Sequence, residues 1–101
     1  MEDRILQATV FEQEVLRRGA QPFFTVVTMG ERAALADVYA SERALVPGDL
    51  IRFDLGCVYQ GYRSDISRTA VLGAPSDKQR RYYDAIRDGE RRPIHVPFAA
   101  V

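Results

Sequence analysis

The sequence predicts an α+β fold in which an antiparallel β-hairpin and one further strand pack against helices. Three observations predict it: a helical apolar stripe at the start of the chain, a β-branched and aromatic segment after it, and a glycine-punctuated region that resembles two paired strands. A chain of 101 residues forms one domain at most.

The first predicted element is a helix over residues 1–18, which Gly19 ends. Its apolar residues recur at helical spacing, which predicts a face packed in the core: Ile5, Ala8, Phe11, Val15 and Leu16. The next element is a strand over residues 22–29, PFFTVVTM, ended by Gly30. The connection over residues 31–47 has no strong pattern, and we expect it to border a functional cleft.

The hairpin is expected from residues 50–55 and 62–72, with Gly56 and Gly61 bracketing a four-residue turn. In that register Asp54 faces Arg63 and Arg52 faces Asp65. The pairing segregates the side chains, because one face is polar (Arg52, Asp54, Arg63, Asp65, Ser67 and Thr69) and the other is mostly apolar (Ile51, Phe53, Leu55, Tyr62, Ser64, Ile66 and Arg68). We expect Ile51, Phe53, Leu55 and Ile66 to pack against a core.

Asp54 and Asp65 become diagonal neighbours in this register, about 7 to 8 Å apart. Carboxylates at that distance can share cations that lie roughly 3.5 to 4 Å apart in paired metal sites. The alternative is a solvated ladder of opposite charges, in which Arg52 and Arg63 pair with the two aspartates. Hairpin geometry leaves both interpretations open. An odd loop length or a bulge would separate the aspartates onto opposite faces.

The last predicted element is a helix from Asp77, because Ser76 followed by Gln79 is typical of a capping box. We expect its apolar stripe to pack in a core, and we expect Gly89 and Pro93 to end it. The members of the stripe are Tyr82, Tyr83 and Ile86.

The motifs GD, DLG and GYRSDISRT together resemble the pita-bread metallopeptidase family, above all its Xaa-Pro aminopeptidase and prolidase branch. The resemblance implies a partial pita-bread fold, with residues 1–90 as the incomplete N-terminal half of a catalytic domain and residues 91–101 as a non-matching, poorly ordered tail. It also implies that Asp54 and Asp65 are two of five ligands to a pair of divalent metal ions, manganese, cobalt or zinc. Tyr62, Arg68 and Thr69 match the same motif and are expected near the substrate or behind the ligands.

Two residues depart from the family pattern beside the expected site. Asp37 stands where the family has a histidine that reaches the substrate, and Arg52 stands where an apolar residue is usual. We hypothesise that the two charges compensate each other by direct pairing. The remaining family ligands, one His and two Glu, are not recognisable here, since His95 lacks the glycine-flanked motif. No catalytic residue is therefore assigned, and the chain alone is not expected to hydrolyse peptides.

The resemblance implies a fragment of a metal-dependent hydrolase that cleaves peptide C–N bonds with a metal-activated water. The alternatives are a creatinase-like hydrolase of a small amide or guanidino compound, and a metal-free binding module. A peptide or small amide is the expected partner, and the parent protein is expected to form a homodimer. In isolation the chain is expected to dimerise or aggregate through an open strand edge.

Fourteen basic and fourteen acidic residues give zero net charge, which provides no field to attract nucleic acid or an anionic membrane. No segment has the length of a transmembrane helix, and the start lacks the pattern of a secretory signal. Cytoplasm is the expected location. The single cysteine, Cys57, cannot form an internal disulfide, and a metal-binding role for it is not favoured.

Overall fold

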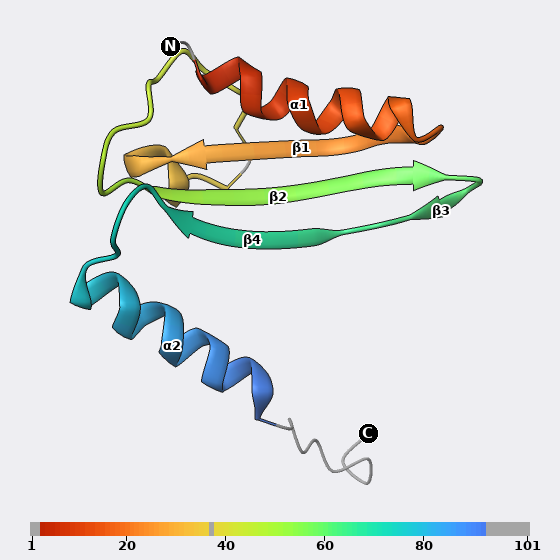
Figure 1. Ribbon diagram of the computed structural model, residues 1–101. Coiled ribbons are helices and arrows are strands. Elements are labelled where there is room, and N and C mark those ends of the chain that lie inside the picture. The colour runs from red at the N-terminus through yellow and green to blue at the C-terminus, as the bar shows by residue number, and fades with distance from the viewer. Residues whose placement is uncertain (1–2, 37, 93–101) are drawn as a thin grey trace, which may run out of the picture.

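The computed structural model describes residues 3–36 and 38–92, and it arranges them as one antiparallel sheet with a helix along one edge and a second helix beyond the other (Figure 1). Strand β2 is central: it pairs with β1 on one side and with β3 and β4 on the other. The elements are α1 (Asp3–Arg17), β1 (Gln21–Met29), the 3-10 helix η1 (Gly30–Ala34), β2 (Leu50–Tyr59), β3 (Tyr62–Arg63), β4 (Ile66–Val71) and α2 (Asp77–Arg91).

The hairpin turn lies four residues later on the first strand than the sequence predicted. Strand β2 runs through Gly56 to Tyr59, and the turn consists of Gln60 and Gly61, whose φ angles are 48° and 83°. Two successive positive φ angles are typical of a type I′ turn, whose twist matches that of paired strands. The predicted turn between Gly56 and Gly61 was therefore wrong, because Cys57, Val58 and Tyr59 are strand residues.

The predicted separation of the two faces is nevertheless confirmed. Leu55 pairs with Ile66 and Asp54 pairs with Ser67, a register shifted by an even number from the expected one. An even shift leaves every side chain on its face. The core lies on the apolar face, where Val27, Met29 and Ile51 are buried and Leu45, Phe53 and Leu55 pack against them.

Ile66 is an exception to this agreement. It lies opposite Leu55 on the core face, yet it is 47% exposed. Strand β4 is the outer strand beside β2, and five of its six residues are exposed. A residue at a sheet edge is buried only where another element covers it, so the expectation that Ile66 packs in the core was wrong.

Gly56 is required by close packing and not by a turn. A register shift between Pro22 and Phe24 on β1 brings Phe24 opposite Gly56. A Cβ atom at Gly56 would lie 2.3 Å from the Phe24 ring and 2.5 Å from the Ser64 carbonyl oxygen. No larger residue fits between these two groups without moving one of them.

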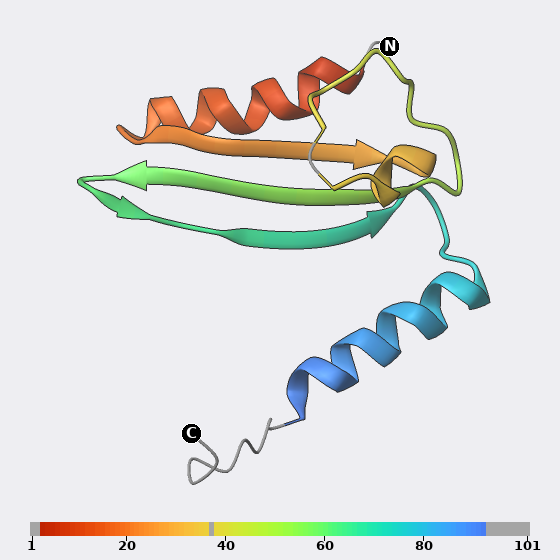
Figure 2. The ribbon, with the colours of Figure 1, turned by 180° about the vertical axis from the view of Figure 1, so that it is seen from behind.

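Helix α1 follows the prediction closely. Val15 is buried, and the helix lies along β1 in both views (Figures 1 and 2). It ends in a Schellman motif, because the N–H of Gly19 donates to Leu16 and the N–H of Ala20 donates to Val15. Gly19 has the positive φ of 81° that this cap needs. Leu16, which we expected in the core, is exposed. Adjacent residues of a helix point about 100° apart, so the side chain next to the buried Val15 faces away from the sheet.

Helix α2 forms as predicted but does not bury its apolar stripe. Its capping box is complete, since Ser76 Oγ accepts from the N–H of Gln79 and Gln79 Oε1 accepts from that of Ser76. The helix extends away from the sheet (Figure 2), and Gln79 Nε2 donates to the carbonyl of Gly48 at 3.1 Å. Its stripe (Tyr82, Tyr83 and Ile86) is exposed, so the expected core packing was wrong for the residues described. The helix also continues past Gly89 to Arg91.

Within residues 3–36 and 38–92, no helix combines the length and the apolar character that crossing a membrane requires.

Candidate metal centre

Asp54 lies in the middle of the central strand, on the face opposite the core. Its neighbours across the sheet are Val26 on β1 and Ser67 on β4. The Ser67 hydroxyl donates to Asp54 Oδ1 at 3.0 Å, and the aspartate is partly buried. One oxygen is thus oriented by a hydroxyl. The carboxylate keeps further lone pairs that can coordinate a metal ion or accept another hydrogen bond.

Asp65 lies in the two-residue interval between β3 and β4 and is exposed. The same register continues on both sides of this interval, which places Asp65 beside Gly56 and diagonal to Asp54. Diagonal neighbours lie about 7 to 8 Å apart. Gly56 itself has no side chain, and the Phe24 ring takes up the position opposite Asp65 that a Cβ atom of residue 56 would occupy.

The interval has a specific hydrogen-bonding pattern that the sequence did not reveal. The N–H of Ser64 donates to the Cys57 carbonyl at 2.9 Å, whereas the N–H of Cys57 donates to Ser64 Oγ at 3.0 Å. A side-chain hydroxyl thus replaces the backbone carbonyl as the acceptor for Cys57. Serine side chains commonly compete with the backbone in this way, which was the available signal.

The charge-ladder alternative does not form in the part of the chain that the structure describes. Arg52 donates to a backbone carbonyl, and the Arg63 guanidinium lies 4.7 Å from the centre of the Phe23 ring. Within the described ranges, no ion pair joins Asp54 or Asp65 to an arginine. The two carboxylates are therefore not neutralised by the arginines on their own hairpin.

The donor chemistry fits a divalent metal in part. Carboxylate oxygens are ligands that hard divalent cations accept, but such ions take about six donors. Among residues 3–36 and 38–92, no group of three or more His, Cys, Asp or Glu side chains is placed to hold a metal ion. The described residues therefore offer two carboxylates, and a complete set of metal donors would require ligands from outside them.

Arg52 lies on the same face as Asp54, between Thr28 on β1 and Thr69 on β4. Its Nη2 donates to the Ala36 carbonyl at 2.6 Å. The hypothesis that Arg52 pairs with Asp37 stays a prediction, because residue 37 lies outside the described residues. Thr69, directly opposite Arg52, is exposed.

Tyr62 and Arg68 lie on the other face, so the structure does not bring their side chains together with Asp54. Tyr62 is opposite Tyr59 near the hairpin turn and is 81% exposed. Arg68 is opposite Phe53 and donates to the carbonyl of Ser67 at 2.7 Å.

The Sγ atom of Cys57 lies 3.3 Å from Ser64 Oγ. His95 falls outside the described residues.

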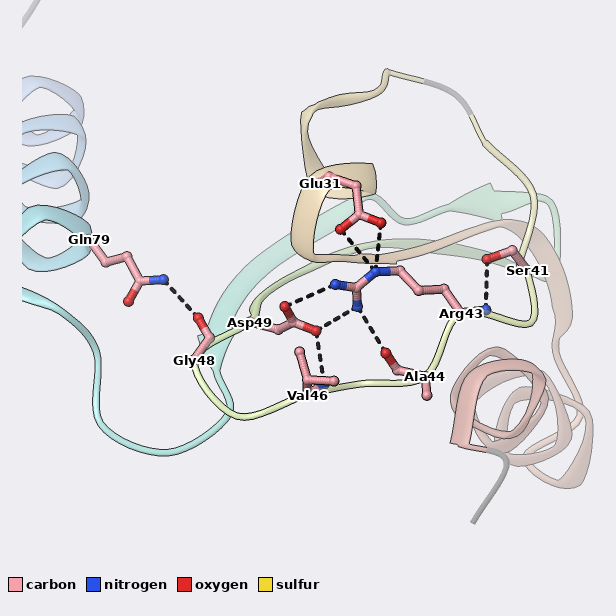
Figure 3. A network of polar contacts seen from close by, with 8 residues as sticks. All are labelled: Glu31, Ser41, Arg43, Ala44, Val46, Gly48, Asp49 and Gln79. Atoms are coloured by element: carbon pink, nitrogen blue, oxygen red, sulfur yellow. Dashed lines mark hydrogen bonds and ion pairs between the residues drawn. The ribbon is translucent and has the colours of Figure 1, made fainter.

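An arginine-centred network in the connection before β2 was missed by sequence reasoning (Figure 3). Arg43 Nε donates to both oxygens of Glu31, at 2.9 and 3.0 Å, and its two terminal nitrogens donate to the two oxygens of Asp49. The Arg43 side chain also reaches the carbonyl of Ala44, and Asp49 accepts from the N–H of Val46 at 2.9 Å. This group of residues fastens η1 to the start of β2.

The network changes the proton affinities of its members. The Arg43 guanidinium, followed by the Val46 N–H, lowers the pKa of Asp49, and Arg43 also lowers the pKa of Glu31. The pKa of Arg43 rises in return, mainly through Asp49. Gly30 makes room for the guanidinium, since a Cβ atom there would lie 2.2 Å from Arg43 Nη2. The sequence signal was the pair Arg43 and Asp49, six residues apart, but nothing in it indicated Glu31.

Comparison with known proteins finds similarity of sequence and fold to metallopeptidases. A model of the metallopeptidase family M24 matches residues 2–96. The Xaa-Pro dipeptidase of Pyrococcus furiosus is 40% identical over 74 residues, which are 73% of this chain and 21% of that protein. The Xaa-Pro dipeptidase of Lactobacillus helveticus is 34% identical over 96 residues, which are 93% of this chain and 26% of that protein.

Solved structures agree with the sequence matches. The prolidase from Pyrococcus furiosus superposes with a TM-score of 0.80 and 39% identity, over 84% of this chain and 26% of that one. The prolidase from Pyrococcus horikoshii OT3 superposes with a TM-score of 0.79 and 38% identity, over 83% of this chain and 25% of that one. The chain therefore spans about a fifth to a quarter of the length of these relatives.

Proposed function

Because the chain belongs to metallopeptidase family M24, we propose that it forms part of a metal-dependent hydrolase of the Xaa-Pro dipeptidase type, which cleaves a peptide C–N bond. The predicted partial pita-bread fold is confirmed by the likeness to the Pyrococcus prolidases. The observation that carries the proposal is the placement of Asp54 and Asp65 on one face of the sheet, with Asp54 oriented by Ser67.

Asp54 and Asp65 are the residues that would hold divalent metal, manganese, cobalt or zinc, together with ligands from outside the described residues. A bound pair of such ions lowers the pKa of a coordinated water and so supplies a nucleophile at neutral pH. The chain's own contribution is to position the carboxylates. The Ser67 hydroxyl fixes one oxygen of Asp54, and the close contact of Gly56 with Phe24 fixes the backbone beside Asp65.

Arg52 and Thr69 share the face of Asp54, which supports a place for both near the substrate. Asp37 is proposed for the same surroundings on its match to the family's histidine position alone. Tyr62 and Arg68 lie on the opposite face, so we propose for them a supporting role in the hairpin, without substrate contact.

The test is a chimera in which residues 3–92 replace the matching segment of the Pyrococcus furiosus prolidase. We expect it to bind manganese or cobalt and to hydrolyse a Xaa-Pro dipeptide. We expect Asp54→Ala to abolish both properties, because a metal-bound carboxylate oxygen cannot be replaced by a methyl group. Asp88→Ala on α2, an exposed residue away from the sheet, is the matched control and should retain both.

Circular dichroism and gel filtration first establish that the chimera folds. A folded chimera that binds no metal would contradict the proposed role of the two aspartates. A folded, metal-loaded chimera that leaves Xaa-Pro dipeptides intact but cleaves a small amide or guanidino compound would move the substrate to the creatinase-like alternative.

A further inference from the structure

Arg52 joins the central strand to the connection that precedes it. Its Nη2 donates to the carbonyl of Ala36 at 2.6 Å, sixteen residues earlier in the chain. Two other arginines hold the same connection from within: Arg32 donates to the Tyr39 carbonyl at 3.1 Å and Arg43 to that of Ala44 at 3.0 Å. Arg52 differs from them because it projects from the sheet itself, two residues before Asp54.

The two ends of the carboxylate-bearing face are covered very differently. Thr28, which lies directly opposite Arg52, is 2% exposed although it is on the face away from the core. Asp65, at the other end of the same face, is exposed. The Nε of Arg52 is also inaccessible to solvent, although its Nη2 makes an exposed hydrogen bond to Ala36. A hydrogen bond from a charged donor to a backbone carbonyl is among the stronger ones in proteins.

We propose that Arg52 is a positioning residue that holds the segment Leu35–Ala36 over the Thr28 end of this face, so that the segment forms a fixed wall of the metal site and substrate approaches from the Asp65 end. The inference rests on the proposed function, because the segment borders a metal site only if Asp54 and Asp65 bind metal. The contact itself does not depend on it, because it is present without metal or substrate.

The first test is amide hydrogen exchange on the 101-residue chain. Replacing the guanidinium by an apolar group, Arg52→Leu, should speed exchange of the Leu35 amide, which donates to the Arg32 carbonyl, by about tenfold or more, because the anchor of this segment is lost. Arg52→Lys keeps a charged donor and should restore much of the protection. The matched control is Arg68→Leu, on the opposite face of the same hairpin, which should leave this segment unchanged.

The second test measures how accessible position 28 is to solvent. It follows the rate at which a thiol reagent modifies the cysteine of Thr28→Cys in a Cys57→Ser background. The buried position predicts slow modification, and adding Arg52→Leu should speed it by about tenfold. Equal modification rates with and without Arg52 would overturn the proposal. So would faster exchange throughout β2 and β4 in Arg52→Leu, because the arginine would then support the whole sheet. Neither readout requires activity, so failure of the proposed function would appear separately, in the chimera.

Discussion

Two aspartates five residues apart, Asp49 and Asp54, show how differently one chain can use the same side chain. Both oxygens of Asp49 accept from Arg43, and one also accepts from the N–H of Val46. Asp54 accepts one hydrogen bond, from Ser67, among the described residues. An ionised carboxylate offers about four acceptor positions. Asp49 is occupied by its own chain and builds structure, whereas Asp54 has capacity for an external ligand.

Burial follows the same division. Asp49 is buried at the base of the hairpin, where the N–H of Gly48 donates to Leu72 and that of Leu72 donates to Asp49. Asp54 is partly buried, and Asp65 is exposed. A buried charge is retained only where it is paired, while an exposed carboxylate without an arginine partner contributes little to folding. The comparison therefore predicts that substitutions at the two places separate stability from metal binding.

The largest effect is expected from Asp49→Asn. The amide cannot accept the paired donors of Arg43, which leaves a guanidinium without its buried partner, so the melting temperature should fall by several degrees. Asp54→Asn is the matched control, and its melting temperature should stay close to that of the parent chain. Thermal unfolding followed by circular dichroism measures both. Equal losses would remove the distinction between the two aspartates.

Gly56→Ala should have the next largest effect on stability. The new Cβ must displace the Phe24 ring or the Ser64 carbonyl, and overpacking of this kind costs about 1–3 kcal/mol of unfolding free energy. Gly89→Ala is the control, because a Cβ there meets nothing within 4 Å and alanine favours a helix by up to about 1 kcal/mol. Urea denaturation should thus show opposite signs for the two changes. A neutral Gly56→Ala would mean that the contact relaxes without cost.

Acid should act on the same network. The pKa values of Asp49 and Glu31 are lowered from ordinary values of 3.8 and 4.5, so both carboxylates bind protons more weakly in the folded state. Their contribution to stability is complete above about pH 4.5 and is lost as the pH falls through the lowered values. Unfolding free energy measured against pH should decline there in the parent chain. It should decline less steeply in Asp49→Asn, and an unchanged slope would contradict the assignment.

The smallest change in stability is expected from Ser67→Ala. The hydrogen bond to Asp54 is exposed, and its loss should cost less than about 1 kcal/mol. The Asp54 carboxylate loses its orienting hydroxyl, so metal affinity should fall more clearly than stability. Ser41→Ala, which removes a hydroxyl from the connection before β2, is a control that should leave metal affinity unchanged. Calorimetric titration of the chimera with manganese compares the two.

The sequence predicted which side chains share a face of the hairpin, but it did not predict the position of the turn, and the reason is physical. Side chains alternate with a period of two, so a register error of four residues left Asp54 and Asp65 on one face. The partial burial of Asp54, the exposure of Asp65 and the absence of arginine pairing in the described ranges could not be predicted from spacing. Those properties depend on where Arg52 and Arg63 point, and each reaches a group that is remote in sequence, Ala36 and Phe23.

Helix α2 and the Arg43 network failed prediction in opposite ways. The stripe with Tyr82 and Ile86 has the periodicity of a core face, but periodicity does not show whether a partner surface is present. The network joins Arg43 to Glu31, twelve residues away across an irregular connection, where no periodic pattern exists to indicate the contact. Local patterns thus predicted the elements, while the contacts between distant segments had to come from the structure.

The most direct test of the central claim is paramagnetic broadening of the chain's amide NMR signals by manganese, with magnesium as the diamagnetic reference. If Asp54 and Asp65 form part of a metal centre, broadening should be strongest at Asp54, Asp65 and Ser67, weak at Asp49, and abolished when both aspartates of the pair are changed to Asn. Broadening that centres on the acidic residues of α2, or that persists unchanged in the double variant, would contradict it.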